Sequence, residues 1–163
     1  MLGKRGVFLS PYLTGGVCPD ATILPVGYVD LPLLLPHCAL FVHHGGIGTL
    51  ARALEAGIPQ IITPLRFDQP DNARRIEDHG LGLRLERDML SGQSLATLAT
   101  RLLADTAGHE RLLEVSAGVR ASRAVQQCAG LLESCVPAGR RSLGSCLLPE
   151  RFAPLADTSA RGR

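Results

Sequence analysis

The chain has 163 residues, of which 45% are hydrophobic and 20% charged, and its formal net charge is +2. This length has room for one domain with its own core, and the longest apolar stretch, 31–42, is interrupted by Pro32, Pro36 and His37, which excludes a membrane span there. The first residues lack the continuous apolar core of a signal peptide, so we expect a cytoplasmic protein.

Apolar runs alternate with helical patterns along most of the chain. We expect strands near 6–10, 23–29, 39–43, 60–64 and 82–85, and helices near 31–36, 48–56, 69–79, 93–104 and 108–134. Asp68 is in place to cap the helix at 69–79, Gly80 to end it, and Gly118 to split the last one. This alternation predicts an α/β fold with a doubly wound, Rossmann-like parallel sheet.

The pattern ends at Pro137. The remaining residues, 137–163, hold five arginines against two acidic residues, and we expect them to form a disordered tail behind a single domain at 1–136. Nucleic-acid binding through this tail is a weak alternative, because its arginines are sparse and a single aromatic residue, Phe152, lies among them. We therefore expect no nucleic-acid partner.

The five cysteines suggest neither a metal site nor a disulfide. They are Cys18, Cys38, Cys128, Cys135 and Cys146, and they form no C-x-x-C pair and no zinc spacing. Cys128 and Cys135 are too far apart along a helix to be bridged. We expect reduced thiols, no bound metal and no cofactor.

The most informative segment is 38–72. It contains an apolar run, a glycine-rich turn, a helical pattern and a second apolar run, and this order places a ligand at the carboxyl ends of parallel strands. Gly45, Gly46 and Gly48 allow backbone N–H groups to approach an anion closely. A helix beginning near Thr49 would add a partial positive charge, and Thr49 can cap it or donate its hydroxyl. The turn therefore predicts a phosphate-binding loop.

Two histidines precede the glycines. His44 can donate a ring N–H to a phosphate oxygen. Because adjacent strand residues point to opposite faces, we expect His43 to lie in the core or against a neighbouring helix if His44 faces the ligand.

Two other interpretations of the loop remain open. A glycine-rich turn between a strand and a helix can serve packing alone. The run from Gly46 to Ala51 also fits the dinucleotide-binding fingerprint, with Asp68 about twenty residues further on. That acidic residue should end a strand, whereas Asp68 falls in an expected loop. A dinucleotide-binding Rossmann domain is therefore a remote alternative.

Several spaced motifs together resemble one family. They are His44-Gly45-Gly46-x-Gly48-Thr49, Gly57-Ile58-Pro59, Pro64, Asp68-Gln69 and Asn72-Ala73. This set resembles the donor-binding signature of the nucleotide-sugar-dependent glycosyltransferases of family 1, with bacterial rhamnosyl-, antibiotic- and sterol-glycosyltransferases as near relatives. The resemblance covers roughly residues 4–105 and implies a domain of GT-B type.

The resemblance implies a role for each matched position. The diphosphate would be bound by His44, Gly45, Gly46, Gly48 and Thr49, the sugar hydroxyls by Asp68 and Gln69, and the base and ribose by Tyr28, Val29 and Arg52. Arg52 stands where many members carry a glutamate for the ribose. It could contact phosphate, or form a surface ion pair with Glu55, three residues further along the helix.

The implied activity is transfer of a hexosyl group from a UDP- or dTDP-linked sugar to an acceptor hydroxyl, with inversion. In the family the acceptor and the catalytic base lie mainly in a first domain, so we expect a missing domain or partner chain to supply them and assign no catalytic residue here. The alternative is an inactive truncated fragment or a nucleotide-sugar-binding subunit. We also expect the domain to be incomplete at its amino end and to lack a strand between 6–10 and 39–43.

Overall fold

The computed structural model describes residues 4–10 and 22–135. Its strands are β1 (Gly6–Leu9), β2 (Ile23–Val26), β3 (Phe41–His43), β4 (Gln60–Ile62) and β5 (Gly82–Arg84). Its helices are α1 (Leu31–Leu34), α2 (Ile47–Ala56), α3 (Gln69–Asp78), α4 (Gly92–Ala104), α5 (Thr106–Ala121) and α6 (Ala124–Cys135), with short 3-10 turns at Leu35–His37 and Arg87–Met89. The expected α/β fold class with parallel strands is confirmed.

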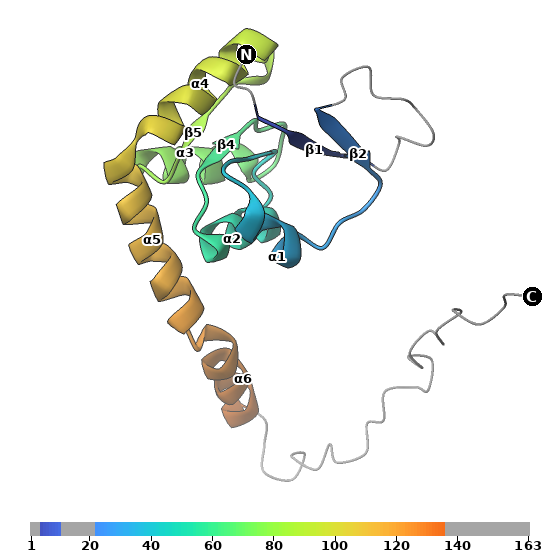
Figure 1. Ribbon diagram of the computed structural model, residues 1–163. Helices are drawn as coiled ribbons and strands as arrows, with labels where there is room; N and C mark the ends of the chain where they lie inside the picture. Colours follow the sequence, from blue (N-terminus) through green and yellow to red (C-terminus); the bar gives the residue numbers. More distant parts are fainter. Residues whose placement is uncertain (1–3, 11–21, 136–163) are drawn as a thin grey trace, which may run out of the picture. The chain divides into compact units, whose positions relative to one another are not determined.

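The described strands pair in two separate parallel sheets (Figure 1). One sheet contains β1 and β2, and the other has the order β3-β4-β5. We expected one doubly wound sheet, but β1 and β3 do not pair with each other. The break lies between the two strands that the family resemblance separates by a further strand.

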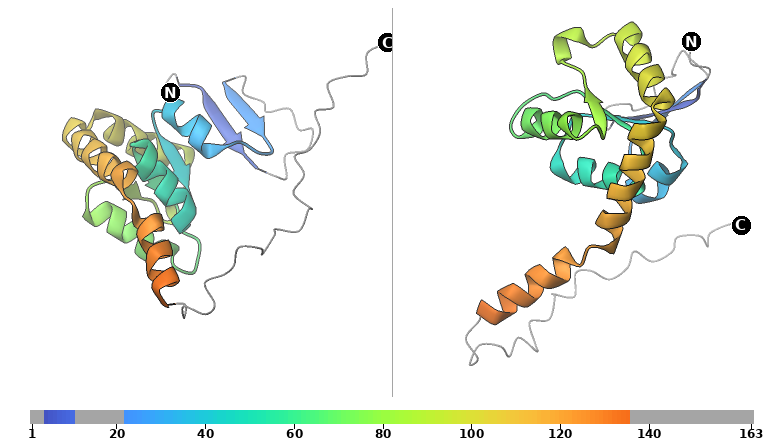
Figure 2. Two further views of the ribbon diagram at one scale, coloured as in Figure 1. Left: turned by 90° about the horizontal axis from the view of Figure 1, so that it is seen from below. Right: turned by 90° about the vertical axis from the view of Figure 1, so that its left-hand side faces the viewer.

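Helices cover both faces of the three-stranded sheet (Figure 2). Ile61 and Ile62 are adjacent in β4 and fully buried, so their side chains enter opposite faces. Ile62 belongs to a cluster with residues of α2, α3 and α5, whereas Ile61 packs with Leu85 and with Ala99 of α4. The three carboxyl ends of this buried sheet therefore share one edge, where the loops of interest begin.

Turn chemistry sets several helix ends as the sequence predicts. Gly57, at φ 69°, ends α2, and Gly80, at φ 65°, follows α3. Both are in the left-handed region that glycine adopts without a Cβ penalty. Asp68 does precede α3, but its side chain caps no backbone N–H of that helix.

The long helix expected at 108–134 is two helices. α5 ends at Ala121 and α6 begins at Ala124, so the break falls at Ser122 and Arg123 and not at Gly118. A first compact unit ends at Ser122, and α6 belongs to a second unit. The expected tail at 137–163 lies outside the described residues.

No helix among residues 4–10 and 22–135 is long and apolar enough to cross a bilayer. Within the same residues Cys38, Cys128 and Cys135 are free thiols. Cys18 and Cys146 lie outside the described residues.

Candidate functional site

The glycine loop joins the carboxyl end of β3 to α2. Gly46 is the N-cap, and the first intrahelical hydrogen bond runs from the Leu50 N–H to the Gly46 carbonyl at 2.9 Å. The expectation that Thr49 caps the helix is therefore wrong, because α2 begins at Ile47 and Thr49 lies inside its first turn. Thr49 is a residue type that caps helices through its side chain, but glycine can also be the N-cap although it offers no side-chain acceptor.

The first turn of α2 offers backbone donors to an anion. The N–H groups of Ile47, Gly48 and Thr49 precede the first intrahelical bond, and such groups have no partner within their own helix. They point along the helix axis, where the macrodipole adds a partial positive charge. The geometry of this end of α2 suits a phosphate group.

Gly45 is held by hydrogen bonds on both sides. Its N–H donates to Nδ1 of His43 at 3.1 Å, and its carbonyl accepts from Nδ2 of Asn72 at 3.0 Å. Its φ of 88° is left-handed, and a Cβ there would come within 2.7 Å of Cγ2 of Ile62. Gly45 thus shapes the turn, while its own N–H faces the protein and not the side where a ligand would lie.

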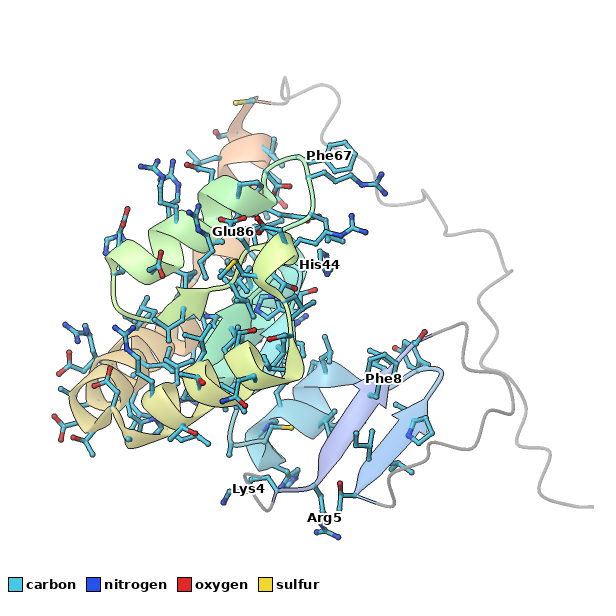
Figure 3. All side chains as sticks on the ribbon, turned by 90° about the horizontal axis from the view of Figure 1, so that it is seen from above. Lys4, Arg5, Phe8, His44, Phe67 and Glu86 are labelled. Atoms are coloured by element: carbon cyan, nitrogen blue, oxygen red, sulfur yellow. The ribbon has the colours of Figure 1, made fainter. Side chains whose placement is uncertain are left out.

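His44 is the exposed member of the histidine pair. A Cβ on Gly46 would lie 2.7 Å from Nε2 of His44, so the imidazole rests against the bare Cα of that glycine. Figure 3 shows the His44 side chain projecting from the loop that follows β3. A ring N–H in this position is available to an anion at the amino end of α2.

His43 is buried, as expected, with only 8% of its surface exposed. Its Nε2 lies 2.9 Å from Oε1 of Gln60, and its ring stacks on Phe41 with centroids 4.8 Å apart. Burial lowers the pKa of His43 below its ordinary 6.5, more than the hydrogen bond to Gln60 raises it. The ring is therefore neutral at physiological pH.

The loop after β4 ends at Asp68, and Gln69 is the first residue of α3; both lie next to the glycine loop. Oδ2 of Asp68 accepts from Nδ2 of Asn72 at 2.8 Å, and Oε1 of Gln69 accepts from the N–H groups of Leu65 and Arg66. Asn72 therefore ties Asp68 to the carbonyl of Gly45. The two expected sugar-binding residues are brought beside the loop, but each also has an internal hydrogen-bonding role.

Phe67 in the same loop is a feature that the sequence did not reveal. It has a left-handed φ of 61°, is 83% exposed, and its ring carries the Arg66 guanidinium at 5.2 Å from its centroid. An aromatic residue in this backbone region costs roughly 1–2 kcal/mol. Figure 3 shows its ring extending away from the ribbon.

The expected base and ribose residues are not gathered at the loop in the same way. Arg52 forms an ion pair with Glu55 at 2.7 Å on the exposed face of α2, as one of our two readings predicted. Tyr28 follows β2 with 85% of its surface exposed, and Val29 is half-buried. Roles of Tyr28, Val29 and Arg52 in nucleotide binding stay predictions.

Within the described residues, no group of three or more His, Cys, Asp and Glu side chains is placed to hold a metal ion. Sequence reasoning also missed Gln60 and the anchoring role of Asn72. Polar residues at the ends of otherwise apolar strands, such as His43 and Gln60, were the available signal.

Comparison with known proteins agrees with the geometry. The family model for the erythromycin biosynthesis protein CIII-like, C-terminal domain matches residues 15–134. A zeaxanthin glucosyltransferase from Pseudescherichia vulneris is 35% identical over 118 residues, which are 72% of this chain and 28% of that protein. This chain thus spans less than a third of that relative's length.

Solved structures show the same fold. The glycotransferase of kitacinnamycin has a TM-score of 0.72 and 20% identity, over 82% of this chain and 44% of that one. The glycosyltransferase VinC, solved in complex with dTDP, has a TM-score of 0.62 and 29% identity, over 71% of this chain and 30% of that one. The resemblance inferred from the loop motifs is confirmed. The chain belongs to the erythromycin biosynthesis protein CIII-like C-terminal domain family, within the GT-B glycosyltransferases of family 1.

Proposed function

We propose that this chain is the donor-binding part of a cytoplasmic glycosyltransferase, which moves a hexosyl group from a UDP- or dTDP-linked sugar to an acceptor hydroxyl with inversion. The observation that carries the proposal is the convergence at one sheet edge of the His44 ring, the first-turn amides of α2 and the loop that carries Asp68. These groups match the two parts of a nucleotide sugar, because amides and an imidazole suit the diphosphate and a carboxylate suits sugar hydroxyls.

The chemistry follows from the charge on the leaving group. When the glycosidic bond to the diphosphate breaks, negative charge develops on the departing phosphate oxygens. The His44 ring N–H and the amides of Ile47, Gly48 and Thr49 would stabilise that charge, together with the helix dipole. The dTDP bound in the VinC structure supports a thymidine diphosphate-linked donor.

The acceptor would be deprotonated by a base outside this chain, since we assign no general base among its residues. Because the chain spans 28% of the glucosyltransferase relative's length, the acceptor site belongs to a further domain or a partner chain in this proposal. The second candidate function is an inactive nucleotide-sugar-binding fragment or subunit. The two differ in turnover and agree in donor binding.

The first experiment is titration calorimetry of the 163-residue chain with dTDP and with UDP, in buffer with and without a chelator. We expect weak binding of at least one diphosphate, unchanged by chelation. His44→Ala should weaken binding by about 1–3 kcal/mol, because it removes a charge-assisted hydrogen bond. Arg74→Ala is the matched control, since its exposed ion pair with Asp71 in α3 is worth little. Binding that depends strictly on a divalent metal would refute the proposed donor site.

A further inference from the structure

We propose that His43 is a positioning residue for donor binding: its buried ring accepts the Gly45 N–H and thereby fixes the turn that presents His44 and the first turn of α2 to the diphosphate. The inference rests on the proposed function. It assigns to His43 a role at the site, beyond the place in the core that the sequence predicts for it.

The hydrogen bonds around His43 determine its tautomer. Nδ1 accepts from the Gly45 N–H at 3.1 Å, so Nδ1 carries no proton. Nε2, at 2.9 Å from Oε1 of Gln60, must then be the ring donor. A neutral ring with its proton on Nε2 satisfies both bonds, whereas a doubly protonated ring would set an N–H against the Gly45 N–H.

Gln60 sets this tautomer from the next strand. The strand register pairs Phe41 with Gln60 and His43 with Ile62, which places His43 and Gln60 diagonally on one face of the sheet. Gln60 is fully buried, and its Nε2 is the one buried side-chain polar atom in the described part of the chain that lacks a hydrogen-bond partner. A buried amide with an unpaired N–H group destabilises the fold relative to an apolar side chain. Gln60 therefore fits a role that an apolar side chain could not fill, namely accepting the hydrogen bond from the His43 Nε2–H.

Gly45 is the point where this internal network meets the ligand loop. Its N–H is fixed by His43 and its carbonyl by Asn72, whose second N–H reaches Asp68. The direction of the backbone after Gly45 sets the position of Gly46, the N-cap residue from which α2 begins. Holding this peptide in one orientation removes conformational freedom that diphosphate binding would otherwise have to remove.

The test measures affinity and stability together in the full chain. His43→Phe keeps a stacking ring but has no acceptor, and we expect dTDP binding to weaken about tenfold while thymidine, which has no phosphate, binds as before. His43→Asn should recover most of the affinity, because its Oδ1 can accept the Gly45 N–H.

Ser116→Ala is the matched control. Ser116 is fully buried, and its hydroxyl donates to the Glu55 carbonyl at 2.8 Å, at the far end of α2. This substitution removes one buried hydrogen bond, so the melting temperature should fall while dTDP affinity stays unchanged. The control separates a loss of stability from a loss of loop orientation.

The outcomes are distinct. If His43→Phe lowers the melting temperature but binds dTDP like the unmodified chain, or if His43→Asn binds no better than His43→Phe, the positioning role is refuted and the proposed function stands. If the unmodified chain binds neither dTDP nor UDP, both fall. Should His43→Phe fail to fold, the 15N chemical shifts of the His43 ring in the unmodified chain decide: a proton on Nδ1 overturns the inference, and one on Nε2 with a slowly exchanging Gly45 amide supports it.

Discussion

Replacing Gly45 by alanine should destabilise the domain more than any other alanine substitution in the glycine loop. The backbone at Gly45 has φ 88°, which costs a residue with a Cβ roughly 1–2 kcal/mol. The new Cβ would also lie 2.7 Å from Cγ2 of Ile62, a fully buried side chain, and such overpacking typically costs about 1–3 kcal/mol. We expect a loss of about 2–5 kcal/mol in the free energy of unfolding.

Urea unfolding followed by circular dichroism measures this loss. Gly48→Ala is the control, because a Cβ at that position meets nothing within 4 Å beyond its chain neighbours and the backbone of its own helix, and the residue is already helical. Alanine there should stabilise the helix by about 0.5–1 kcal/mol. Gly45→Ala and Gly48→Ala with equal unfolding free energies would refute the geometry deduced for the turn.

Three further predictions concern the site, the pH dependence and the activity. Asp68→Asn should reduce any preference for a nucleotide sugar over the free diphosphate in competition binding, while diphosphate affinity stays nearly intact. A loss of diphosphate affinity as large as that of His44→Ala would mean that Asp68 acts only through its hydrogen bond to Asn72 and not on the sugar. Because burial lowers the pKa of His43 below 6.5, the unfolded chain takes up this proton at a higher pH than the folded one. The contribution of His43 to stability should therefore be complete above about pH 6.5 and fall as the pH drops to the lowered folded pKa. Urea unfolding of the unmodified chain and of His43→Phe across this pH range measures that contribution as a difference in unfolding free energy. A His43-dependent gain in stability on acidification would contradict the prediction. The isolated chain should release no nucleoside diphosphate from a sugar donor when a hydroxyl acceptor is added, and acceptor-dependent turnover by the purified monomer would mean that a catalytic base has been overlooked.

Local sequence patterns were sufficient for the main elements of the site. Glycines directly after a strand predicted a tight turn into a helix, and α2 begins one residue before the expected start at residue 48. Strand alternation correctly placed His43 inside and His44 outside. These features depend on neighbours in the chain, so the sequence carries them directly.

The contacts that decide the function of each group depend on tertiary structure. Whether the Gly45 N–H faces a ligand or the protein depends on His43, whose tautomer depends on Gln60, seventeen residues away on another strand. The link from Asn72 to the Gly45 carbonyl spans 27 residues and requires α3 to pack beside the loop.

The sequence by itself therefore determined the kind of loop and its family, because turn, helix and strand signals act over a few residues. Only the tertiary structure decided which loop groups are free to bind. Gly45 and Asp68 carry the residue types of a binding site, yet their hydrogen bonds to His43 and Asn72 also make them part of the scaffold. Hydrogen-bond partners are selected by strand register and helix packing, which no short segment of the chain specifies alone.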